Sequence, residues 1–558
     1  MSQRGGRLTS RIASLAVVFV WIHGGAAGYA QQPVTIPPPP SPQAIAAAAS
    51  FGPDERVVAT HYFYWYRWPD QHFFDDANRR DDALRQHFPD HRNVSYASKD
   101  WQRRQMEDLL AAGIDVALLI YWGAPNQYDK PDLRFSVDGI PPLVAALDEL
   151  AARGRTPRIG MFYDTSTLLG EHAFREPGRG NVDLCTAEGR DIFYRTIRDF
   201  FRLLPPRHWA CLDGRPIVQL YEAAFAAGHD RQTIEYVYER FAKDFAGRRP
   251  FIIAGPSWSF RADARTGWGA ALGGPILGDG FAQIGPGYDD SPVSGRDTPT
   301  RDRLAGGFYR ASWLLALRVR PRMVIVETWN ELHEGTGICE TLEDGRFYID
   351  LTRRYSELLK AGREPSGDDW AAAVAGLLNA PASNRAGRQF ASRLSLEFSV
   401  TANGSSSGRL VEQGLRLIPG VADGMFQPAR VGGSTCVATS PGVSEHRYLY
   451  FDVADPYYYD HRGTLTLRFE YFDSPGEPVV VQYDSTDETS AVADRYKEHP
   501  QPITRTGSNE WKTVTRRLPG ARCANRQNGG ADFRLLSIGG ELAIRRVEVS
   551  KLPDGYAD

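Results

Sequence analysis

The stretch "WNELHEGTGICET", residues 329–341, places Glu331 and Glu334 three positions apart with His333 between them. Cleavage of a glycosidic bond needs a proton donor at the leaving oxygen and a second carboxylate that acts as nucleophile, base or charge stabiliser. Like charges held close together raise the pKa of one carboxyl toward the value that a general acid requires. The two glutamates are therefore a candidate catalytic pair, and Asn330 and His333 are suited to orienting a sugar hydroxyl or holding one glutamate in place.

Three other roles for this stretch stay open. Hydrolytic zinc sites usually take two histidines in an H-E-x-x-H pattern, whereas only His333 is present here, so we expect no metal and no cofactor. Glu340 is suited to the N-terminus of a following helix, where a carboxylate meets unpaired N–H groups. The third role is a solvated surface turn, against which the apolar Trp329 and Leu332 argue.

The elements that would position these side chains lie between residues 57 and 362, where apolar runs alternate with amphipathic helical patterns. Runs that are continuously apolar are typical of parallel strands covered on both faces. Seven such runs favour an α/β fold, a closed (β/α)8 TIM-like barrel over residues 51–362, although the eighth strand is not evident. An open doubly wound sheet is the alternative, weakened because no glycine-rich phosphate loop follows the first run.

The carboxyl ends of the predicted strands are rich in aromatic residues. Barrels of this kind carry their sites at those ends. Six of the seven runs end in an aromatic residue beside a polar group or a second aromatic, as expected of a groove that stacks on sugar rings and binds their hydroxyls. A single aromatic there is more often a packing residue, but the recurrence indicates a carbohydrate site. The predicted substrate-binding residues are Tyr64, Trp65, Trp122, Tyr163, Asp164, Tyr221, Glu222, Trp258, Tyr288, Asn330 and His333.

Length and charge limit the remaining possibilities. A chain of 558 residues exceeds the size at which one core stops growing, so two or more domains are expected. Lysine plus arginine (65) nearly balances aspartate plus glutamate (68), and no dense basic stripe appears, so a nucleic-acid partner is not expected. We expect a monomer whose partner is a polysaccharide or oligosaccharide substrate.

Residues 1–30 are predicted to be a signal peptide. A basic start, a mostly apolar run that ends at Ile22 and small residues before and at Ala30 form the usual pattern. The apolar run is shorter than the roughly 20 residues of a membrane-spanning helix. We therefore expect a secreted or periplasmic protein with no membrane association after signal removal. Residues 31–50 follow as a proline-rich linker.

The chain changes character after the predicted barrel. Residues 363–390 resemble a linker around a short alanine-rich helix. From residue 391 to 553 the apolar pattern has period two, as in "TLTLRFEYF", where alternate residues from Leu465 to Tyr471 share a face. This pattern predicts a C-terminal antiparallel β-sandwich domain. Structural support and polysaccharide binding are equally open as its role.

The five cysteines allow two disulfides. Cys185 and Cys211 lie in one half of the chain, and Cys436 and Cys523 lie in the other. Cys339 is then the odd one out. Buried free thiols are an equally open alternative, and no cysteine or histidine pair has the short spacing of a structural zinc site.

Several motifs resemble those of one glycosidase clan. "HYFYWYRWP", "YWG", "GPGYDD", "GRDTPTRDRLAGGFYRASW" and above all "TWNELHEGT" resemble the glycoside hydrolase family 99 clan, which includes endo-α-1,2-mannosidases, and the related WbsX-type proteins. The resemblance covers about residues 57–362. It implies a (β/α)8 barrel and retaining cleavage of an α-glycosidic bond. It also implies that Glu331 assists the sugar's own 2-hydroxyl in forming an epoxide-like intermediate, and that Glu334 is the general acid and base, with Asn330 beside them.

Two positions depart from the family pattern. Leu332 stands where the family commonly has an aromatic, and Cys339 displaces the usual acid to Glu340. Substrate contacts near them are therefore expected to differ. We predict an exported glycoside hydrolase that uses the Glu331 and Glu334 pair. The alternatives are a non-catalytic glycan-binding or polysaccharide-assembly protein, and an enzyme that transfers glycosyl groups.

Overall fold

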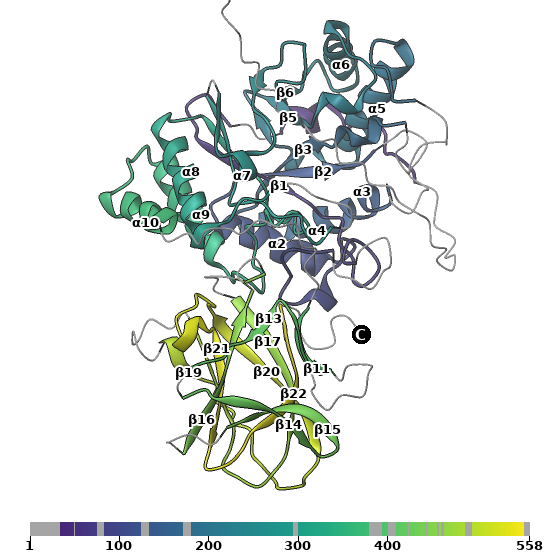
Figure 1. Cartoon of the computed structure of the whole chain (residues 1–558). Helices are drawn as coiled ribbons and strands as arrows, with labels where there is room; N and C mark the ends of the chain where they lie inside the picture. The colour runs from purple at the N-terminus through teal and green to yellow at the C-terminus, as the bar shows by residue number, and fades with distance from the viewer. Residues whose placement is uncertain are drawn as a thin grey trace, which may run out of the picture.

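The chain folds into a barrel body and an all-β body that lie end to end (Figure 1). This computed structural model describes residues 34–48, 51–74, 83–123, 133–170, 180–278, 280–293, 299–378, 393–399, 409–421, 423–440, 445–454, 457–458, 463–485 and 494–551. The predicted signal peptide lies outside the described residues. Within them, no helix has both the length and the apolar character needed to cross a membrane.

The barrel sheet confirms the predicted TIM-like fold. Its strands run in the order β7-β6-β5-β3-β2-β1-β10-β9-β8, and every neighbouring pair from β7 to β9 is parallel. Except for the short β7 and β8, these strands are almost entirely buried, as expected when helices cover the outer face of a closed sheet. The strands are β1 (Val57–Tyr62), β2 (Val116–Tyr121), β3 (Arg158–Tyr163), β4 (Cys211–Leu212), β5 (Arg215–Leu220), β6 (Phe251–Ala254), β7 (Ala264–Arg265), β8 (Ile276–Gly278), β9 (Phe281–Ile284) and β10 (Met323–Val326).

The strand that the sequence does not reveal is β7. It is the eighth parallel strand among the described residues, and it pairs with β6 through Ala264 and Arg265 alone. Two residues are too few to form an apolar run. β8 pairs antiparallel with β9, and β4 pairs antiparallel with β5, so these two short strands lie outside the parallel repeat. The sheet is a nearly closed barrel.

Helices surround the sheet, and several begin at side-chain caps. Ser98 accepts a hydrogen bond from the backbone N–H of Trp101 at the start of α2, and Thr186 accepts one from Gly189 at the start of α5. The helices are α2 (Lys99–Ala111), α3 (Phe135–Asp138), α4 (Ile140–Ala152), α5 (Ala187–Leu203), α6 (Arg231–Asp244), α7 (Ala270–Gly273), α8 (Gly307–Arg318) and α9 (Phe347–Lys360). Short 3-10 turns are η1 (His91–Asn93), η3 (Thr165–Leu168), η4 (Pro206–His208), η5 (Ala223–Phe225) and η6 (Leu304–Gly306).

The described parts of both predicted linkers contain helices. In the first, the side chain of Ser41 caps α1 (Pro42–Ala46). Pro42 is compatible with this helix because it occupies the first turn, and Ile45 is buried. In the second, α10 (Gly367–Leu378) packs on α8, where a Cβ atom on Gly376 would lie 2.6 Å from the Cα of Gly307. Both segments therefore contact the barrel.

The C-terminal body is the predicted antiparallel sandwich. One sheet has the order β12-β11-β22-β15-β14, with β17 between β22 and β20, and the other has the order β13-β16-β21-β18-β19. Leu465, Leu467, Phe469 and Tyr471 are all buried between the sheets, as the period-two pattern predicts. The strands are β11 (Arg393–Ser399), β12 (Arg409–Gln413), β13 (Leu415–Leu417), β14 (Phe426–Val431), β15 (Ser434–Thr439), β16 (His446–Val453), β17 (Gly463–Phe472), β18 (Val480–Tyr483), β19 (Lys497–Glu498), β20 (Trp511–Ala521), β21 (Phe533–Ile538) and β22 (Ala543–Ser550), with 3-10 turns η7 (Asp494–Tyr496) and η8 (Asn528–Gly530).

All five cysteines are free thiols in the structure. Neither possible disulfide forms, so the alternative of free thiols holds. Cys185 is exposed, whereas Cys211, Cys339, Cys436 and Cys523 are buried. Burial raises the pKa of Cys211 and Cys436 to about 11, because a thiolate loses hydration inside the protein.

Candidate active site

The acidic stretch forms a closed turn after β10. The side chain of Thr328 accepts a hydrogen bond from the backbone N–H of Glu331 at 2.8 Å. The N–H of Thr336 returns to the carbonyl of Glu331 at 3.2 Å, and that of Cys339 donates to the carbonyl of Trp329 at 2.9 Å. These bonds satisfy backbone groups that would otherwise be buried and unpaired. The turn is therefore ordered, which excludes the solvated-loop role.

The segment after residue 83 holds the turn from outside. The N–H groups of Arg85 and Gln86 donate to the carbonyl of Leu332 at 2.8 and 3.2 Å. The amide of Gln86 binds both the N–H and the carbonyl of Gly337. Gly335 has φ +59°, and a Cβ atom there would lie 2.8 Å from Cγ of Arg85. The glycines of the "GTG" sequence are thus required by close packing.

Glu331 is held by His333. One carboxylate oxygen, Oε1, accepts from Nδ1 of His333 at 2.8 Å and from its backbone N–H at 3.2 Å. The other oxygen, Oε2, is buried and finds no hydrogen-bond partner among the described residues. Glu331 is 4% exposed. The contacts of Oε1 therefore fix the orientation of the carboxylate, and Oε2 is left for a further contact.

Tyr66 supports this pair from behind. Its ring stacks on that of His333 with 5.7 Å between centroids. Its hydroxyl donates to the carbonyl of Asn330 at 3.0 Å and accepts from the N–H of Leu332 at 3.1 Å. Burial raises the pKa of Tyr66 well above its usual value, and the nearby charge of Glu331 adds to this. Tyr66 therefore stays a neutral phenol that bridges the backbone of the turn.

Asn330 fastens the turn to the first strand. Its Oδ1 accepts from the backbone N–H of Phe63 and its Nδ2 donates to the carbonyl of Phe63, both at 2.8 Å. The side chain is fully buried. The observed contact is thus with the backbone, and the predicted contact with a sugar hydroxyl stays a prediction.

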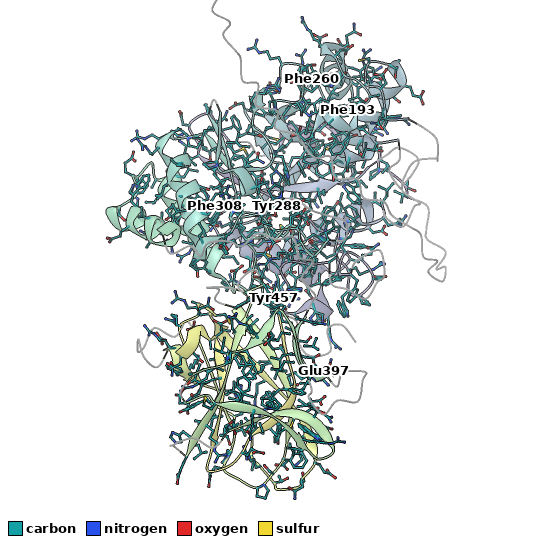
Figure 2. All side chains as sticks on the ribbon, viewed as in Figure 1. Phe193, Phe260, Tyr288, Phe308, Glu397 and Tyr457 are labelled. Atoms are coloured by element: carbon teal, nitrogen blue, oxygen red, sulfur yellow. The ribbon has the colours of Figure 1, made fainter. Side chains whose placement is uncertain are left out.

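Glu334 is half-buried at the far end of the turn. Its backbone carbonyl accepts from the N–H of Asp289 at 2.8 Å, which brings the segment of Tyr288 beside it. Tyr288 lies within the barrel body (Figure 2), and its hydroxyl donates to Asp290. Burial opposes ionisation of Asp289, but the Arg85 guanidinium at 2.6 Å outweighs this, and the pKa of Asp289 is lowered. Asp289 is therefore a charged anchor for the segment.

Two predicted tryptophans lie near His333. Trp65 meets Trp122 edge to face at 5.2 Å and His333 at 5.9 Å between centroids. The indole N–H of Trp122 donates to Asp164 at 2.6 Å, whereas that of Trp65 is buried without a hydrogen-bond partner among the described residues. Burial raises the pKa of Asp164, and the charge of Glu331 acts in the same direction. The structure thus brings these three predicted residues to the Glu331 side of the barrel.

Tyr64 follows β1 and packs against the helix α3. Its hydroxyl donates to the carbonyl of Ser136 at 3.2 Å, and its ring packs edge to face on Phe135. Tyr64 is fully buried and packs against α3, so its contact with a sugar stays a prediction.

Tyr163 and Trp258 both pack against the helix α5. Tyr163 stacks on Phe193 of α5 at 5.0 Å between centroids. Trp258 packs on Phe193 and Phe260, and its indole N–H donates to the carbonyl of Tyr221 at 2.6 Å. Figure 2 labels Phe193 and Phe260 in the outer part of the barrel body. Both residues belong to the hydrophobic core of the barrel body, and their contact with a sugar stays a prediction.

Tyr221 and Glu222 follow β5 on another side of the barrel. Both are half-buried. The ring of Tyr221 meets Trp268 edge to face at 5.2 Å, and Trp268 stacks on Phe162 at 5.2 Å and 12°. Tyr221 therefore joins an aromatic group that the sequence prediction missed. The contact of Tyr221 and Glu222 with a sugar stays a prediction.

A buried polar chain crosses the barrel interior and was also missed. His61 contacts Gln219 at 3.0 Å, Gln219 donates to Gln283 at 3.2 Å, and Gln283 donates to Glu327. The carboxylate of Glu327 also accepts hydrogen bonds from the backbone N–H groups of Gly269 and Ala271. Burial raises the pKa of Glu327 to about 7 and lowers that of His61 to about 4. In the sequence, Glu327 is recognisable as an acid directly after the apolar run "MVIV", but the pair Glu331 and Glu334 that follows is more conspicuous.

The metal alternative has no geometric support. Within the described ranges, no three histidine, cysteine, aspartate or glutamate side chains gather closely enough to hold a metal ion. His333 instead donates to Glu331. The arrangement suits acid-base chemistry, because a carboxylate held by a ring N–H and backbone N–H has a defined orientation.

Comparison with known proteins gives local similarity to mannosidases. The chain is 33% identical over 89 residues to a glycoprotein endo-alpha-1,2-mannosidase-like protein of Mus musculus, which covers 13% of this chain and 20% of that protein. It is 34% identical over 89 residues to the glycoprotein endo-alpha-1,2-mannosidase of Xenopus laevis, with 13% and 20% covered. The chain thus spans about a fifth of the length of these relatives. The resemblance to this clan is confirmed as a similarity.

Solved structures and a family model complete the comparison. The GH99 endo-alpha-mannosidase of Bacteroides thetaiotaomicron is 16% identical, with a TM-score of 0.38 over 55% of this chain and 98% of that chain. The isomalto-dextranase of Arthrobacter globiformis T6, complexed with panose, is 13% identical, with a TM-score of 0.26 over 94% and 100%. Residues 43–364 match the model described as "Domain of unknown function (DUF5010)". Because that match covers more than half of the chain, the protein belongs to the DUF5010 family.

Proposed function

We propose that this protein is an exported glycoside hydrolase that cleaves α-glycosidic bonds of an oligosaccharide or polysaccharide with retention of configuration. One observation carries the proposal: a rigid turn at the carboxyl end of β10 bears Glu331 and Glu334, and the Oε2 atom of Glu331 is buried without a hydrogen-bond partner among the described residues. A barrel enzyme places its chemistry at this end of the strands. The local similarity to endo-α-1,2-mannosidases supports the same reaction class.

In the first half of the proposed reaction, the sugar 2-hydroxyl gives its proton to Glu331 while its oxygen attacks the anomeric carbon. The bond to the leaving oxygen breaks, and Glu334 protonates that oxygen. In the second half, Glu334 takes a proton from water, the water oxygen attacks the anomeric carbon, and the 2-oxygen recovers its proton from Glu331. Two inversions give net retention. His333 would orient Glu331 throughout, because it binds only Oε1.

Aromatic and acidic groups near the pair would hold the sugar. Trp65 and Trp122 lie beside His333, and Tyr288 lies in the segment bound to Glu334. Aromatic rings suit the apolar faces of sugars. Asp164, Tyr221 and Glu222 are proposed as more distant contacts.

We further propose that residues 1–30 direct export to the periplasm or the medium, that residues 51–362 are catalytic and that residues 391–553 are accessory. α-1,2-Linked mannosides are the first substrates to test, because the similar proteins carry that name. Leu332 and Cys339 make other α-linked glycans equally necessary in the panel. Both residues are buried in the turn, so any effect on specificity would act through its shape.

The test is to incubate the mature protein with a panel of α- and β-linked glycans and to measure new reducing ends and product anomers. Wild type is expected to release reducing ends from an α-linked glycan with the α anomer formed first. Glu331→Gln and Glu334→Gln are expected to be inactive. Glu340→Gln is the matched control, since Glu340 pairs with Arg346 away from the carboxylate pair. Glycan binding without new reducing ends would favour a binding protein, and longer products would favour a transferase.

A further inference from the structure

The two bodies meet at the loop that follows the candidate catalytic turn. The N–H of Thr464, at the start of β17, donates to the carbonyl of Leu342 at 2.6 Å. A Cβ atom on Gly463 would lie 2.1 Å from the carbonyl oxygen of Glu343 and 2.2 Å from its Cα. No side chain fits in that space, so glycine is needed there. The sandwich thus touches the barrel backbone directly, only a few residues after Cys339.

The start of β17 is itself firmly held. The N–H of Gly463 donates to the hydroxyl of Tyr458 at 3.0 Å, and that hydroxyl donates to the carbonyl of Ala521 at 3.0 Å. Tyr457, at the junction of the two bodies in Figure 2, accepts from the N–H of Lys551 and lies under its ammonium group at 4.4 Å. The sandwich side of the contact is therefore rigid.

One route leads from this contact to the turn through Glu343. Its carboxylate is buried and binds both Nδ1 of His87, at 2.5 Å, and the backbone N–H of His87, at 3.0 Å. Burial opposes ionisation of Glu343, but His87 and then Lys551 outweigh it, and the pKa of Glu343 is lowered. The residue before His87, Gln86, binds Leu332 and Gly337 of the turn. The loop that Gly463 covers is thus bonded to the segment that clamps the turn.

A second route passes through Asp344. Its carboxylate accepts from Nε2 of Gln86 at 3.2 Å and lies 3.4 Å from Nη1 of Arg303. Arg303 donates through Nη2 to the carbonyls of Gly335 and Gly337, both at 2.7 Å. Both routes begin in the loop that Gly463 covers and end on the turn between Glu331 and Cys339.

We propose that the sandwich is a positioning element of the active site, which holds loop 341–345 through Gly463 and Thr464 and thereby sets the geometry of the Glu331 and Glu334 turn. The catalytic part of this inference rests on the proposed function, whereas the mechanical part does not. Gly463 is a positioning residue, because it contacts neither Glu331 nor Glu334 and acts through loop 341–345.

The first test is hydrogen exchange of the peptide that covers residues 329–345 in Gly463→Ala. The added methyl group must displace the backbone of Glu343, so exchange at 329–345 is expected to rise at least tenfold. Gly540→Ala is the matched control in the same sandwich, since a Cβ atom there meets chiefly the tip of the Arg505 side chain, at 3.1 Å. Exchange in that variant is expected to equal wild type.

The second readout is the division between kcat and KM on the glycan that wild type cleaves. Displacement of a catalytic group by about 1 Å can cost on the order of a hundredfold in rate. We expect Gly463→Ala to lower kcat at least tenfold with KM within about threefold of wild type. Gly540→Ala should keep both constants. If wild type cleaves no glycan, the proposed function fails, and hydrogen exchange alone decides the positioning role.

A milder variant covers the case in which Gly463→Ala does not fold. Tyr458→Phe removes the hydroxyl that accepts the N–H of Gly463 and should raise exchange at 329–345 at least threefold. Tyr483→Phe is its control, because it removes a hydroxyl of the same sandwich that binds the carbonyl of Pro519, away from Gly463. Wild-type exchange in Tyr458→Phe, or in a folded Gly463→Ala, would overturn the inference.

Discussion

The Oε1 atom of Glu331 lies 2.8 Å from Nδ1 of His333, and this contact is buried. A carboxylate can only accept, so His333 donates from Nδ1. Tyr66 stacks on the histidine ring and thereby limits its rotation. The relationship leaves Oε2 as the oxygen of Glu331 that would take the sugar proton in the proposed mechanism.

Replacing Glu331 by glutamine should lower kcat by about a hundredfold to ten-thousandfold, the usual contribution of a general base. Glutamine keeps the shape of the side chain but cannot take the proton of a sugar hydroxyl. Initial rates on the best glycan of the panel measure the effect, with Glu340→Gln as the control. Rates within twofold of wild type would remove Glu331 from the mechanism.

Glu334→Gln should be equally slow on natural glycans but should recover on a glycosyl substrate with a good leaving group, such as a nitrophenolate. That group departs without a proton, so loss of the general acid matters less in the first step. Burst and steady-state rates on both substrates provide the measurement. Equal losses on both substrates would argue against an acid role.

Tyr66→Phe should lower both stability and kcat, whereas Tyr64→Phe should lower stability alone. Each variant loses one buried hydroxyl, which costs about 1 to 3 kcal/mol when a partner is left unsatisfied. Only Tyr66 bonds to the turn, at Asn330 and Leu332, since Tyr64 bonds to Ser136. Denaturant unfolding and kcat measured together give the comparison. A normal kcat in Tyr66→Phe would show that the turn holds its geometry without this bridge.

Glu327 should make the folded state less stable as pH rises from about 4.5 to about 7. Its folded pKa of about 7 exceeds the usual value of 4.5, so the folded protein binds the proton more tightly than the unfolded chain does. The stability lost across this window is about 3 kcal/mol. The free energy of unfolding of wild type minus that of Glu327→Gln, measured by denaturant between pH 4.5 and 8, should fall by that amount and level off above pH 7.

His61 provides the opposite control within the same polar chain. Its pKa is lowered to about 4, so its contribution to stability is lost as pH falls from about 6.5 to about 4. The free energy of unfolding of wild type minus that of His61→Gln should therefore rise with pH. A difference that is flat with pH for both variants would mean that neither group is held in the protonation state that its burial favours.

Much of the fold follows from the pattern of apolar residues. β1, β2, β3 and β10 are predicted by continuous apolar runs, because strands under helices need apolar groups on both faces. β7 escapes because two residues carry no pattern. In the sandwich, the alternating residues Leu465, Leu467, Phe469 and Tyr471 of β17 are all buried, as predicted.

The candidate site could be predicted only in part. Trp65 and Tyr64 are equally good candidates in a sequence, but one faces His333 and the other packs under the helices. An apolar run has no period from which inner and outer faces can be told apart. Glu327 and Trp268 were missed for a related reason, since their importance depends on groups that lie distant in the chain.

The sequence by itself predicted the kind of chemistry, because Glu331 and Glu334 on a short turn after a buried strand suit the proposed acid-base pair. It also determined the two architectures through the periods of their apolar residues. Only the tertiary structure decided which oxygen of Glu331 is engaged, which aromatics face it, and that Gly463 of the sandwich holds the loop behind it. The facing aromatics and the Gly463 contact join residues more than a hundred positions apart, and no local pattern encodes such contacts. The contact between Glu331 and His333 is local in sequence, but it depends on the shape that the packed turn gives to the backbone.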